Sequence, residues 1–404
     1  MSYLERTIEH TIRRAASEFP SVILTGPRQS GKTTLLKKQF SKTHQYVSLE
    51  PPDIRQSAVT DPRGFLEYYN APVILDEVQY APELLPYIKE RIDLERGLAG
   101  QYILTGSQNL LLMERVTETL AGRAAVLRLL PLSRREALRQ PNLPLAWERK
   151  SSISIKAETS TKQLWKEFLR GYYPELVAQP KRDFSLWQSS YLQTYLERDI
   201  RALRQIGDLS LFQNFLRALA ARHGQLLNIT DISRDIGVAV NTAKAWLSVL
   251  EASYQIVLLR PYFVNAGKRL VKSPKVYFTD SGLLCHLVGL RDADHAALSP
   301  MAGAIFEGVV VMEIIKRIVH QGLEPTVYFW RTSYGAEVDI VVEMNGRLYP
   351  VEVKLSSTPN KAMTAGLKLF LSSFSNASNG YVVYPGKVSM PLASNIVAQP
   401  FANL

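Results

Sequence analysis

The sequence predicts an α/β protein in which a parallel sheet is followed by a helical unit and then by an α+β unit. Three stretches of the chain indicate this order. Residues 1–140 alternate short apolar runs with helical stretches, residues 164–262 follow a helical pattern, and residues 263–404 mix helices with strands. Residues 141–163, rich in Ser, Thr and Lys, are expected to form a linker. The length of 404 residues suits two or three domains of about 150 residues each.

Composition and charge narrow the class of protein. Hydrophobic residues make up 46% of the chain and charged residues 21%, which excludes disordered and collagen-like classes. No run approaches the ~18 uncharged apolar residues of a membrane helix, and the first residues lack the layout of a secretory signal. We therefore expect a cytoplasmic protein without a membrane partner. The net charge of +11 favours a polyanionic partner, because phosphate contacts release counterions.

Five short and largely apolar runs are expected to be the strands of the parallel sheet. Strands that are buried on both faces lack the alternation of apolar and polar residues that half-exposed strands have. The runs are residues 22–24, 46–49, 73–75, 102–104 and 125–127.

The first run leads into a glycine-rich loop. Residues 26–33 read GPRQSGKT and match the pattern G-x-x-x-x-G-K-[ST] between a strand and a helix. We expect Lys32 to reach the β- and γ-phosphates of ATP and the Thr33 hydroxyl to bind Mg²⁺. The alternative is an ordinary glycine turn before a helix. The expected nucleotide-binding residues are Gly26, Pro27, Arg28, Gln29, Ser30, Gly31, Lys32, Thr33 and Thr34.

Polar side chains follow the third and fourth runs, at the sheet edge where ligands bind in open parallel sheets. Asp76 is expected to hold Mg²⁺ through water, and Glu77 to act as the general base for the attacking water. An acidic turn after a core strand is the alternative. Ser107 is a candidate contact for the γ-phosphate or the water. Arg123 is a candidate arginine finger, within one chain or across subunits, and a surface arginine is an equally good interpretation.

These motifs resemble a prokaryotic ATPase family of the AAA+ superfamily whose members carry a carboxyl-terminal domain of unassigned function. The resemblance covers nearly the whole chain and implies nucleotide binding. The segments that carry it are residues 26–35 (GPRQSGKTTL), 75–79 (LDEVQ), 104–108 (LTGSQ), 120–123 (LAGR), 195–199 (YLERD) and 272–282 (KSPKVYFTDSG).

Residues 229–250 predict a helix-turn-helix, with the turn at Gly237 and Asn241 as the amino-terminal cap of the second helix. An apolar strand at residues 254–259 follows, and the whole resembles a winged-helix DNA binder. The alternative is a structural packing unit followed by a solvated basic loop. The candidate nucleic-acid contacts, which suit phosphate binding better than base readout, are Lys244, Arg260, Lys268, Arg269, Lys272 and Lys275.

Acidic residues in the last hundred positions suggest a second metal site. Asp339 lies in an apolar strand, and Glu352 and Lys354 alternate onto one face of the next strand. Together with Glu307 in an apolar helix, they resemble the PD-(D/E)XK nuclease-like superfamily, which implies Mg²⁺ bound by Glu307, Asp339 and Glu352, with Lys354 as a catalytic residue. The alternatives are ordinary salt bridges, or a domain that grips nucleic acid without cleaving it.

The leading hypothesis is a Mg²⁺-dependent ATPase that acts on nucleic acid, with DNA favoured over RNA, and that has a possible nuclease centre in its last domain. A homo-oligomer is possible. A second hypothesis is a nucleotide-gated signalling or defence switch with a protein partner, and a third is an ATP-binding scaffold with a dead site. The cofactors implied are ATP and Mg²⁺.

Overall fold

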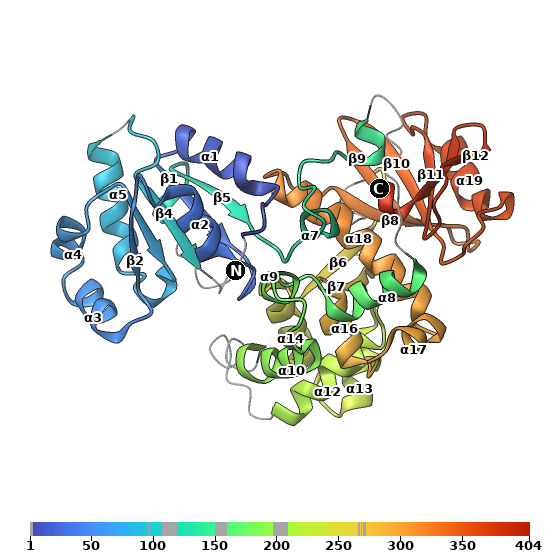
Figure 1. Ribbon diagram of the computed structural model, residues 1–404, viewed down its shortest axis with the longest axis horizontal. Helices are drawn as coiled ribbons and strands as arrows, with labels where there is room; N and C mark the ends of the chain where they lie inside the picture. Colours follow the sequence, from blue (N-terminus) through green and yellow to red (C-terminus); the bar gives the residue numbers. More distant parts are fainter. Residues whose placement is uncertain are drawn as a thin grey trace.

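Two sheets organise the molecule in the computed structural model, which describes residues 3–95, 97–106, 119–149, 160–196, 209–265, 267, 269 and 272–404. A five-stranded parallel sheet has the order β2-β3-β4-β1-β5, and an eight-stranded mixed sheet has the order β12-β13-β11-β10-β9-β8-β6-β7. Figure 1 shows the parallel sheet and the carboxyl-terminal sheet on opposite sides of the long helix α18, with the helical middle of the chain beneath them. The predicted fold class is confirmed.

The five strands of the parallel sheet lie where the apolar runs predict them. The interior strands β1, β3 and β4 are buried along their whole length, whereas the edge strands β2 and β5 are partly exposed. This difference is what the positions of the strands in the sheet require, because only an interior strand is covered on both sides. The strands are β1 (Ser21–Thr25), β2 (Gln45–Ser48), β3 (Val73–Asp76), β4 (Tyr102–Gly106) and β5 (Ala124–Arg128).

Helices cover both faces of this sheet. Successive side chains of a strand point to opposite faces, so Val22 and Leu24 of β1 pack with α1 and α2, whereas Ile23 packs on the other face. The other face is covered by α4 and α5 and by residues of α3. The helices are α1 (Ile8–Glu18), α2 (Lys32–Phe40), α3 (Pro52–Thr60), α4 (Pro62–Tyr68), the 3₁₀ turn η1 (Val78–Tyr80) and α5 (Leu84–Leu94).

The middle of the chain is helical, as predicted. Residues 229–236 and 240–252 form two helices joined at Gly237, whose φ of 73° suits glycine at a helix end. One detail of the prediction is wrong: the second helix begins at Val240 after Ala239, so Asn241 lies inside its first turn and is not its cap. The elements are α7 (Arg134–Ala137), η2 (Ala146–Glu148), α8 (Thr161–Arg170), α9 (Pro174–Ala178), α10 (Phe184–Tyr191), η3 (Leu192–Leu196), α12 (Leu209–Ala220), α13 (Ile229–Ile236) and α14 (Val240–Ala252).

The carboxyl-terminal sheet takes strands from both sides of residue 262. Strand β6, which follows the helix-turn-helix as predicted, pairs with β7 in antiparallel and with β8 in parallel orientation. The sheet therefore joins the helical middle to the last hundred residues. Its strands are β6 (Ile256–Pro261), β7 (Lys275–Phe278), β8 (Val327–Arg331), β9 (Glu337–Met344), β10 (Arg347–Val353), β11 (Gly380–Tyr384), β12 (Met390–Ala393) and β13 (Ile396–Pro400).

The long helix α18 (Ala302–His320) connects the parts of the molecule. Nearly all of its residues are buried, and its apolar side chains belong to one large core that also contains residues of the helical middle and of β9, β10 and β11. Among the described helices, none combines the length and the apolar character needed to cross a bilayer. The remaining elements are α16 (Ser281–Leu287), α17 (Ala293–Leu298), η4 (Lys361–Thr364), α19 (Ala365–Ser373) and η5 (Phe401–Asn403).

Candidate functional site

The glycine-rich loop connects β1 to α2, and its two glycines meet different demands. A Cβ atom on Gly26 would lie 2.1 Å from the backbone oxygen of Leu129, so only glycine lets the loop approach the segment after β5. Gly31 has a φ of 95°, a conformation that side-chain-bearing residues rarely adopt. Gly31 precedes the first residue of α2 and provides no side-chain cap, which leaves the first amides of the helix available to a ligand.

The Lys32 side chain folds back over this loop. Its Nζ donates hydrogen bonds to the backbone oxygens of Gly26, at 2.9 Å, and Pro27, at 3.0 Å, and the residue is 5% exposed. The ammonium therefore lies next to the backbone that is expected to surround the phosphates. Ser30 is also buried, whereas Thr34 is exposed at the mouth of the site.

Asp76 ends β3 and accepts hydrogen bonds from three side chains. Thr33 Oγ1 donates to Asp76 Oδ2 at 2.8 Å, and the Tyr46 hydroxyl donates to the same oxygen at 2.6 Å. The hydroxyl of Thr105 donates to Oδ1. Burial, together with the hydrogen bond to Asp76, raises the pKa of Tyr46, so this hydroxyl keeps its proton. Carboxylate and hydroxyl oxygens are the ligands that Mg²⁺ prefers, and the Thr33–Asp76 pair fits that ion.

Glu77 follows in an unusual backbone conformation. Its φ of 60° lies in the left-handed region, which is uncommon for a residue other than Gly, Asn or Asp. The Glu77 amide donates to Thr105 Oγ1 at 3.1 Å, and the side-chain amide of Gln79 donates to the Glu77 carboxylate. The left-handed turn thus places the Glu77 side chain at the cavity beside the loop.

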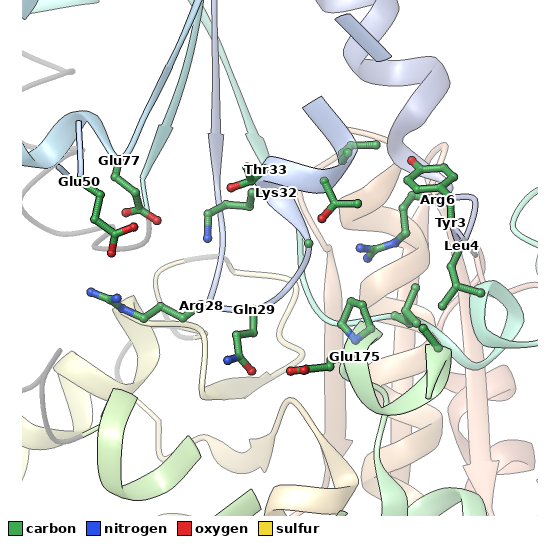
Figure 2. A pocket seen from close by; sticks show the side chains of 16 residues that line it. Tyr3, Leu4, Arg6, Arg28, Gln29, Lys32, Thr33, Glu50, Glu77 and Glu175 are labelled. Carbon is green, nitrogen blue, oxygen red and sulfur yellow. The ribbon is translucent and has the colours of Figure 1, made fainter. Parts of the chain in front are cut away.

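A cavity of about 480 Å³ lies against the phosphate loop, within the size range of small-molecule sites. One wall contains the loop, the start of α2, Glu50 and Glu77. Figure 2 shows Lys32, Thr33 and Glu77 around this space, with Tyr3 and Leu4 across from the two acids. The rest of the lining is apolar apart from one guanidinium and one carboxylate, and it consists of Tyr3, Leu4, Arg6, Leu132, Pro174, Glu175 and Ala178.

Sequence reasoning missed several of these neighbours. Thr105 lies near the carboxyl end of β4, so strand-end position was an available signal for it, whereas Tyr46 is the second residue of β2 and strand-end position does not mark it. Tyr3 and Arg6 precede the first helix and belong to no pattern that identifies a site.

Two of the expected catalytic residues do not contribute to the described site. Ser107 lies outside the described residues, and Arg123 lies at another edge of the sheet. Arg123 precedes β5 at the amino end of the parallel strands, because Ala124 is in register with Ser21, whereas the phosphate loop follows the carboxyl end of β1. Its guanidinium is paired with Asp93, with Nε to Oδ1 at 2.7 Å and Nη2 to Oδ2 at 3.0 Å. The interpretation of Arg123 as a finger within one chain is therefore wrong.

The acids of the last domain come together between α18, β9 and β10. The Val353 amide donates to Asp339 Oδ2 at 2.8 Å, which fixes this carboxylate across the two strands. Lys354 Nζ lies 2.6 Å from Glu352 Oε1 and 3.8 Å from Asp339 Oδ2. The predicted convergence of Asp339, Glu352 and Lys354 is thus present in the structure.

Glu307 reaches the same region from α18, with partners that the sequence did not indicate. It accepts a hydrogen bond from the Tyr277 hydroxyl, and its Oε1 lies 3.3 Å from Lys275 Nζ. Lys275 also pairs with Glu337 Oε1 at 2.6 Å and is only 6% exposed. The interpretation of Lys275 as a phosphate-backbone contact is therefore wrong, because this ammonium is buried among carboxylates.

The electrostatics of this carboxylate cluster resist full ionisation. Burial, reinforced by the charge of Asp339, raises the pKa of both Glu307 and Glu352 to about 7. Burial also raises the pKa of Asp339. Glu352 Oε2 is buried and accepts no hydrogen bond from the described residues.

The donor set of the cluster suits a hard cation, but the geometry is not that of a closed metal site. Carboxylate oxygens are the ligands of Mg²⁺ and Mn²⁺, and the unsatisfied Glu352 oxygen is a position that a cation would satisfy. Within the described ranges, however, no group of three or more His, Cys, Asp or Glu side chains is arranged to hold a metal ion. A divalent ion bound to Asp339 and Glu352 must therefore compete with the ammonium of Lys354.

The remaining basic candidates divide into exposed and internally bonded residues. Lys244 on α14 and Lys272 before β7 are exposed, and Arg260 in β6 is half-buried. Arg269 donates to Glu343 Oε2 at 3.1 Å and to the Tyr328 hydroxyl at 2.9 Å. These bonds engage part of its guanidinium within the chain, so a phosphate contact by Arg269 stays a prediction. Lys268 lies outside the described residues.

Comparison with known proteins agrees with this arrangement. Residues 18–138 match the AAA domain family, and residues 161–294 and 302–404 match two domains of unknown function, DUF8612 and DUF4143. The parallel sheet, the phosphate loop and this match define the fold of an AAA-type ATPase with a P-loop. The match to DUF4143 does not assign a nuclease fold to the last domain.

Two relatives with similar sequences show to which protein family the chain belongs. The chain is 30% identical over 390 residues to the uncharacterized protein Rv2008c of Mycobacterium tuberculosis and to its counterpart Mb2031c of Mycobacterium bovis. The match covers 96% of this chain and 82% of theirs, and the chain belongs to their family. Among solved structures, the Walker-type ATPase PABY2304 of Pyrococcus abyssi is similar over 70% of this chain and 96% of that one, with 16% identity and a TM-score of 0.46.

Proposed function

We propose that this protein is a Mg²⁺-dependent ATPase that binds ATP at the phosphate loop and couples its hydrolysis to an action on DNA. ATP binding and hydrolysis are supported by the groups around one cavity of about 480 Å³. These groups are the Lys32 ammonium, the Thr33–Asp76 pair and the Glu77 carboxylate. Each group has a counterpart in the chemistry of phosphoryl transfer.

The proposed roles follow from these positions. Lys32 exchanges its bonds to the loop carbonyls for bonds to the β- and γ-phosphates, where its charge stabilises the transition state. Thr33 and Asp76 would hold Mg²⁺, and the bound ion would supply positive charge that stabilises the phosphates. Glu77 orients the attacking water and accepts its proton. Ser107 is proposed as a further contact for the water or for the γ-phosphate.

The apolar wall of the cavity suits the base of the nucleotide. Tyr3 provides an aromatic ring, and Leu4, Pro174 and Leu132 provide apolar surface, with Pro174 next to Gly31 of the phosphate loop. A flat aromatic base gains stacking and burial against such a wall. ATP, rather than a simple phosphate compound, is therefore the proposed substrate.

An action on DNA is supported by charge and by the helix-turn-helix. The net charge of +11 favours an anionic partner, and Lys244 is exposed on the second helix of the pair. An α-helix fits the major groove of duplex DNA, whereas the major groove of duplex RNA is too deep and narrow for side chains to read. DNA is therefore proposed in preference to RNA.

The test is the rate of ATP hydrolysis with and without single-stranded, duplex and branched DNA. We expect DNA to stimulate turnover several-fold, and we expect Lys244→Ala to lower that stimulation, because removing a phosphate contact weakens DNA binding. Lys166→Ala, an exposed lysine on α8, is the matched control. A turnover rate that is indifferent to every DNA form would support the alternative of a nucleotide-gated switch with a protein partner.

The carboxylate cluster is proposed as a metal-dependent nuclease centre. The acids Glu307, Asp339 and Glu352 would hold a divalent ion that polarises a phosphate, and the ammonium of Lys354 would stabilise the negative charge developing on it. We expect labelled DNA to be cleaved with Mg²⁺ or Mn²⁺, and we expect Asp339→Asn to abolish the products. Asp294→Asn, the same change at an exposed position on α17, is the control. If no DNA or RNA form were cleaved, the nuclease proposal would be wrong and this domain would at most bind nucleic acid.

A homo-oligomer is proposed on the basis of Arg123. Since this residue lies at the end of the sheet away from its own phosphate loop, it can serve as an arginine finger only for a second copy of the chain. Its ion pair with Asp93 must open for that contact to form.

A further inference from the structure

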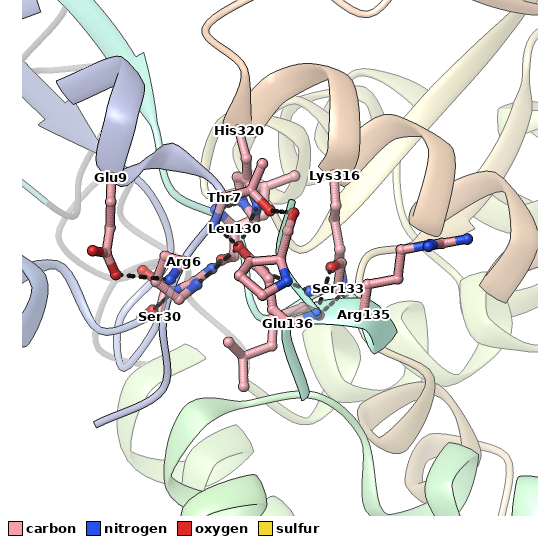
Figure 3. A network of polar contacts seen from close by, with 12 residues as sticks. Arg6, Thr7, Glu9, Ser30, Leu130, Ser133, Arg135, Glu136, Lys316 and His320 are labelled. Carbon is pink, nitrogen blue, oxygen red and sulfur yellow. Dashed lines mark hydrogen bonds and ion pairs between the residues drawn. The ribbon is translucent and has the colours of Figure 1, made fainter. Parts of the chain in front are cut away.

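Arg6 lies outside every motif of the site, yet it contacts the phosphate loop directly. Its Nη1 donates to the backbone oxygen of Ser30 at 2.9 Å, and its Nη2 donates to the backbone oxygen of Leu130 at 2.7 Å. The residue is 5% exposed and lines the same cavity as Lys32. The planar guanidinium therefore joins the phosphate loop to the segment that follows β5 (Figure 3).

The bond to Ser30 constrains the loop where phosphate binding requires it. In a trans peptide the C=O and the N–H point in opposite directions, so holding the Ser30 oxygen fixes the direction of the Gly31 amide. Gly31 has a φ of 95° and immediately precedes α2, whose first amides have no side-chain cap. Without an external constraint, glycine samples many conformations and an ordered phosphate site is more costly to form.

Glu136 holds Arg6 in this position. One of its oxygens lies 3.2 Å from Arg6 Nε, and the carboxylate also accepts the amides of Thr7 at 2.8 Å and Ser133 at 2.8 Å. Burial alone would raise the pKa of Glu136, but the charge of Arg6 lowers it overall, so the carboxylate stays ionised. A buried guanidinium is stable only when it is paired in this manner.

The last partner of Glu136 comes from a distant part of the chain. His320, the final residue of α18, is fully buried, and its Nδ1 lies 3.2 Å from Glu136 Oε1. The Leu130 amide donates to His320 Nε2 at 3.1 Å, so Nε2 carries no hydrogen. The neutral ring then carries its hydrogen on Nδ1, facing Glu136.

Two more side chains of α18 contact the same segment. Lys316 Nζ donates to the Leu132 oxygen at 3.0 Å, and Glu313 Oε2 accepts the Arg134 amide at 2.7 Å. Residues 313, 316 and 320 are spaced three and four apart and therefore share one face of the helix. This face of α18 therefore holds residues 130–134 in place. The backbone oxygen of Leu130, in this segment, accepts the hydrogen bond from Arg6.

We propose that Arg6 is a positioning residue for the nucleotide site, which orients the Ser30–Gly31 peptide for phosphate binding, and that Glu136 and His320 make this orientation depend on the docking of α18. The proposal rests on the proposed function in one respect: the loop must bind a nucleotide. It adds that the affinity for the nucleotide is set partly by a helix of the last domain, the same helix that carries Glu307.

The first test is Arg6→Lys, with nucleotide affinity measured by titration of fluorescent ATP and ADP in Mg²⁺ and the full-length chain. An ammonium keeps the charge but cannot bond Ser30, Leu130 and Glu136 in one plane. We expect affinity to fall about tenfold, the usual cost of losing a charge-assisted hydrogen bond. Arg14→Lys, on the exposed face of α1, is the matched control.

A structural role alone predicts a different pattern, since it would lower the unfolding temperature without nucleotide and leave the affinity of the folded protein within about twofold of wild type. That result would overturn the positioning role. If the wild-type protein itself binds no nucleotide, the proposed function fails instead, so the two failures are distinguishable.

The dependence on α18 is tested with His320→Leu and with the double variant. His320→Leu is expected to weaken nucleotide affinity although the residue touches no part of the loop. The double variant Arg6→Lys/His320→Leu is expected to lose less affinity than the product of the two single losses, because the residues act through the same Glu136. A loss equal to the product would contradict the linkage.

Hydrogen exchange on the wild-type protein provides a second measurement that needs no variant. Binding of nucleotide orders the loop, so the amides of Leu130 and Arg134, which are bonded to α18 side chains, are expected to exchange more slowly when ATP is bound. Unchanged exchange at both amides in the presence of saturating ATP would also overturn the dependence on α18.

Discussion

Lys32→Ala is expected to lower ATP turnover by roughly 100-fold or more and to weaken nucleotide binding, because it removes the charge that stabilises the transferred phosphoryl group. The side chain is buried, and its ammonium donates hydrogen bonds to the loop carbonyls of Gly26 and Pro27. An alanine leaves those carbonyls at the edge of a cavity, where water can reach them. We therefore expect Lys32→Ala to fold like the wild-type protein but to lose ATP turnover.

The measurement is the steady-state release of phosphate in Mg²⁺, combined with thermal unfolding to verify the fold. Lys42→Ala is the matched control, since this exposed lysine lies just after α2 and outside the cavity. If Lys32→Ala hydrolysed ATP as fast as the control, the loop would not be part of the active site.

Glu77→Gln is expected to separate binding from chemistry. Glutamine has the shape of glutamate but cannot accept a proton, and a positioned general base contributes about 10²–10⁴-fold to a rate. The Gln79 amide that donates to Glu77 can still donate to the amide oxygen of the new residue. We therefore expect turnover to fall by roughly 100-fold or more while the dissociation constant for ATP stays within about threefold.

The control for this variant is Glu50→Gln, the same change at another carboxylate of the cavity wall. A small effect there and a large one at Glu77 would identify the base. Equal effects would mean that both acids act only through their charge, and an unchanged rate in Glu77→Gln would exclude Glu77 as the base.

The fold of the first domain could be predicted because its signals are local. Each interior strand is a run of apolar residues, and the phosphate loop requires glycine at fixed positions, one for a close backbone approach and one for a positive φ. The placement of Glu352 and Lys354 on one face of their strand followed from strand alternation in the same way.

The wrong predictions concern residues whose surroundings are set by partners that are distant in the sequence. Lys275 belongs to a basic stretch, but folding places it between Glu307 and Glu337. Arg123 was a candidate arginine finger, but the register of β5 with β1 puts it at the end of the sheet away from the phosphate loop. Burial and pairing with distant residues leave no periodic signal in a single sequence.

The contacts around Arg6 illustrate the same limit. Arg6 and Leu130 are separated by 124 positions and Leu130 and His320 by 190, so only the folded chain brings them together. A lone arginine before the first helix has no feature that separates it from other surface arginines in the sequence.

The central claim is that the loop, Lys32 and the Thr33–Asp76 pair form one nucleotide site with Mg²⁺. Calorimetric titration of the full-length wild-type protein with a non-hydrolysable ATP analogue tests it most directly, in Mg²⁺ and in EDTA. One nucleotide is expected to bind per chain, more weakly in EDTA, and binding is expected to disappear in Lys32→Ala. Absence of binding to the wild-type protein, or equal binding to the variant in both conditions, would contradict the account.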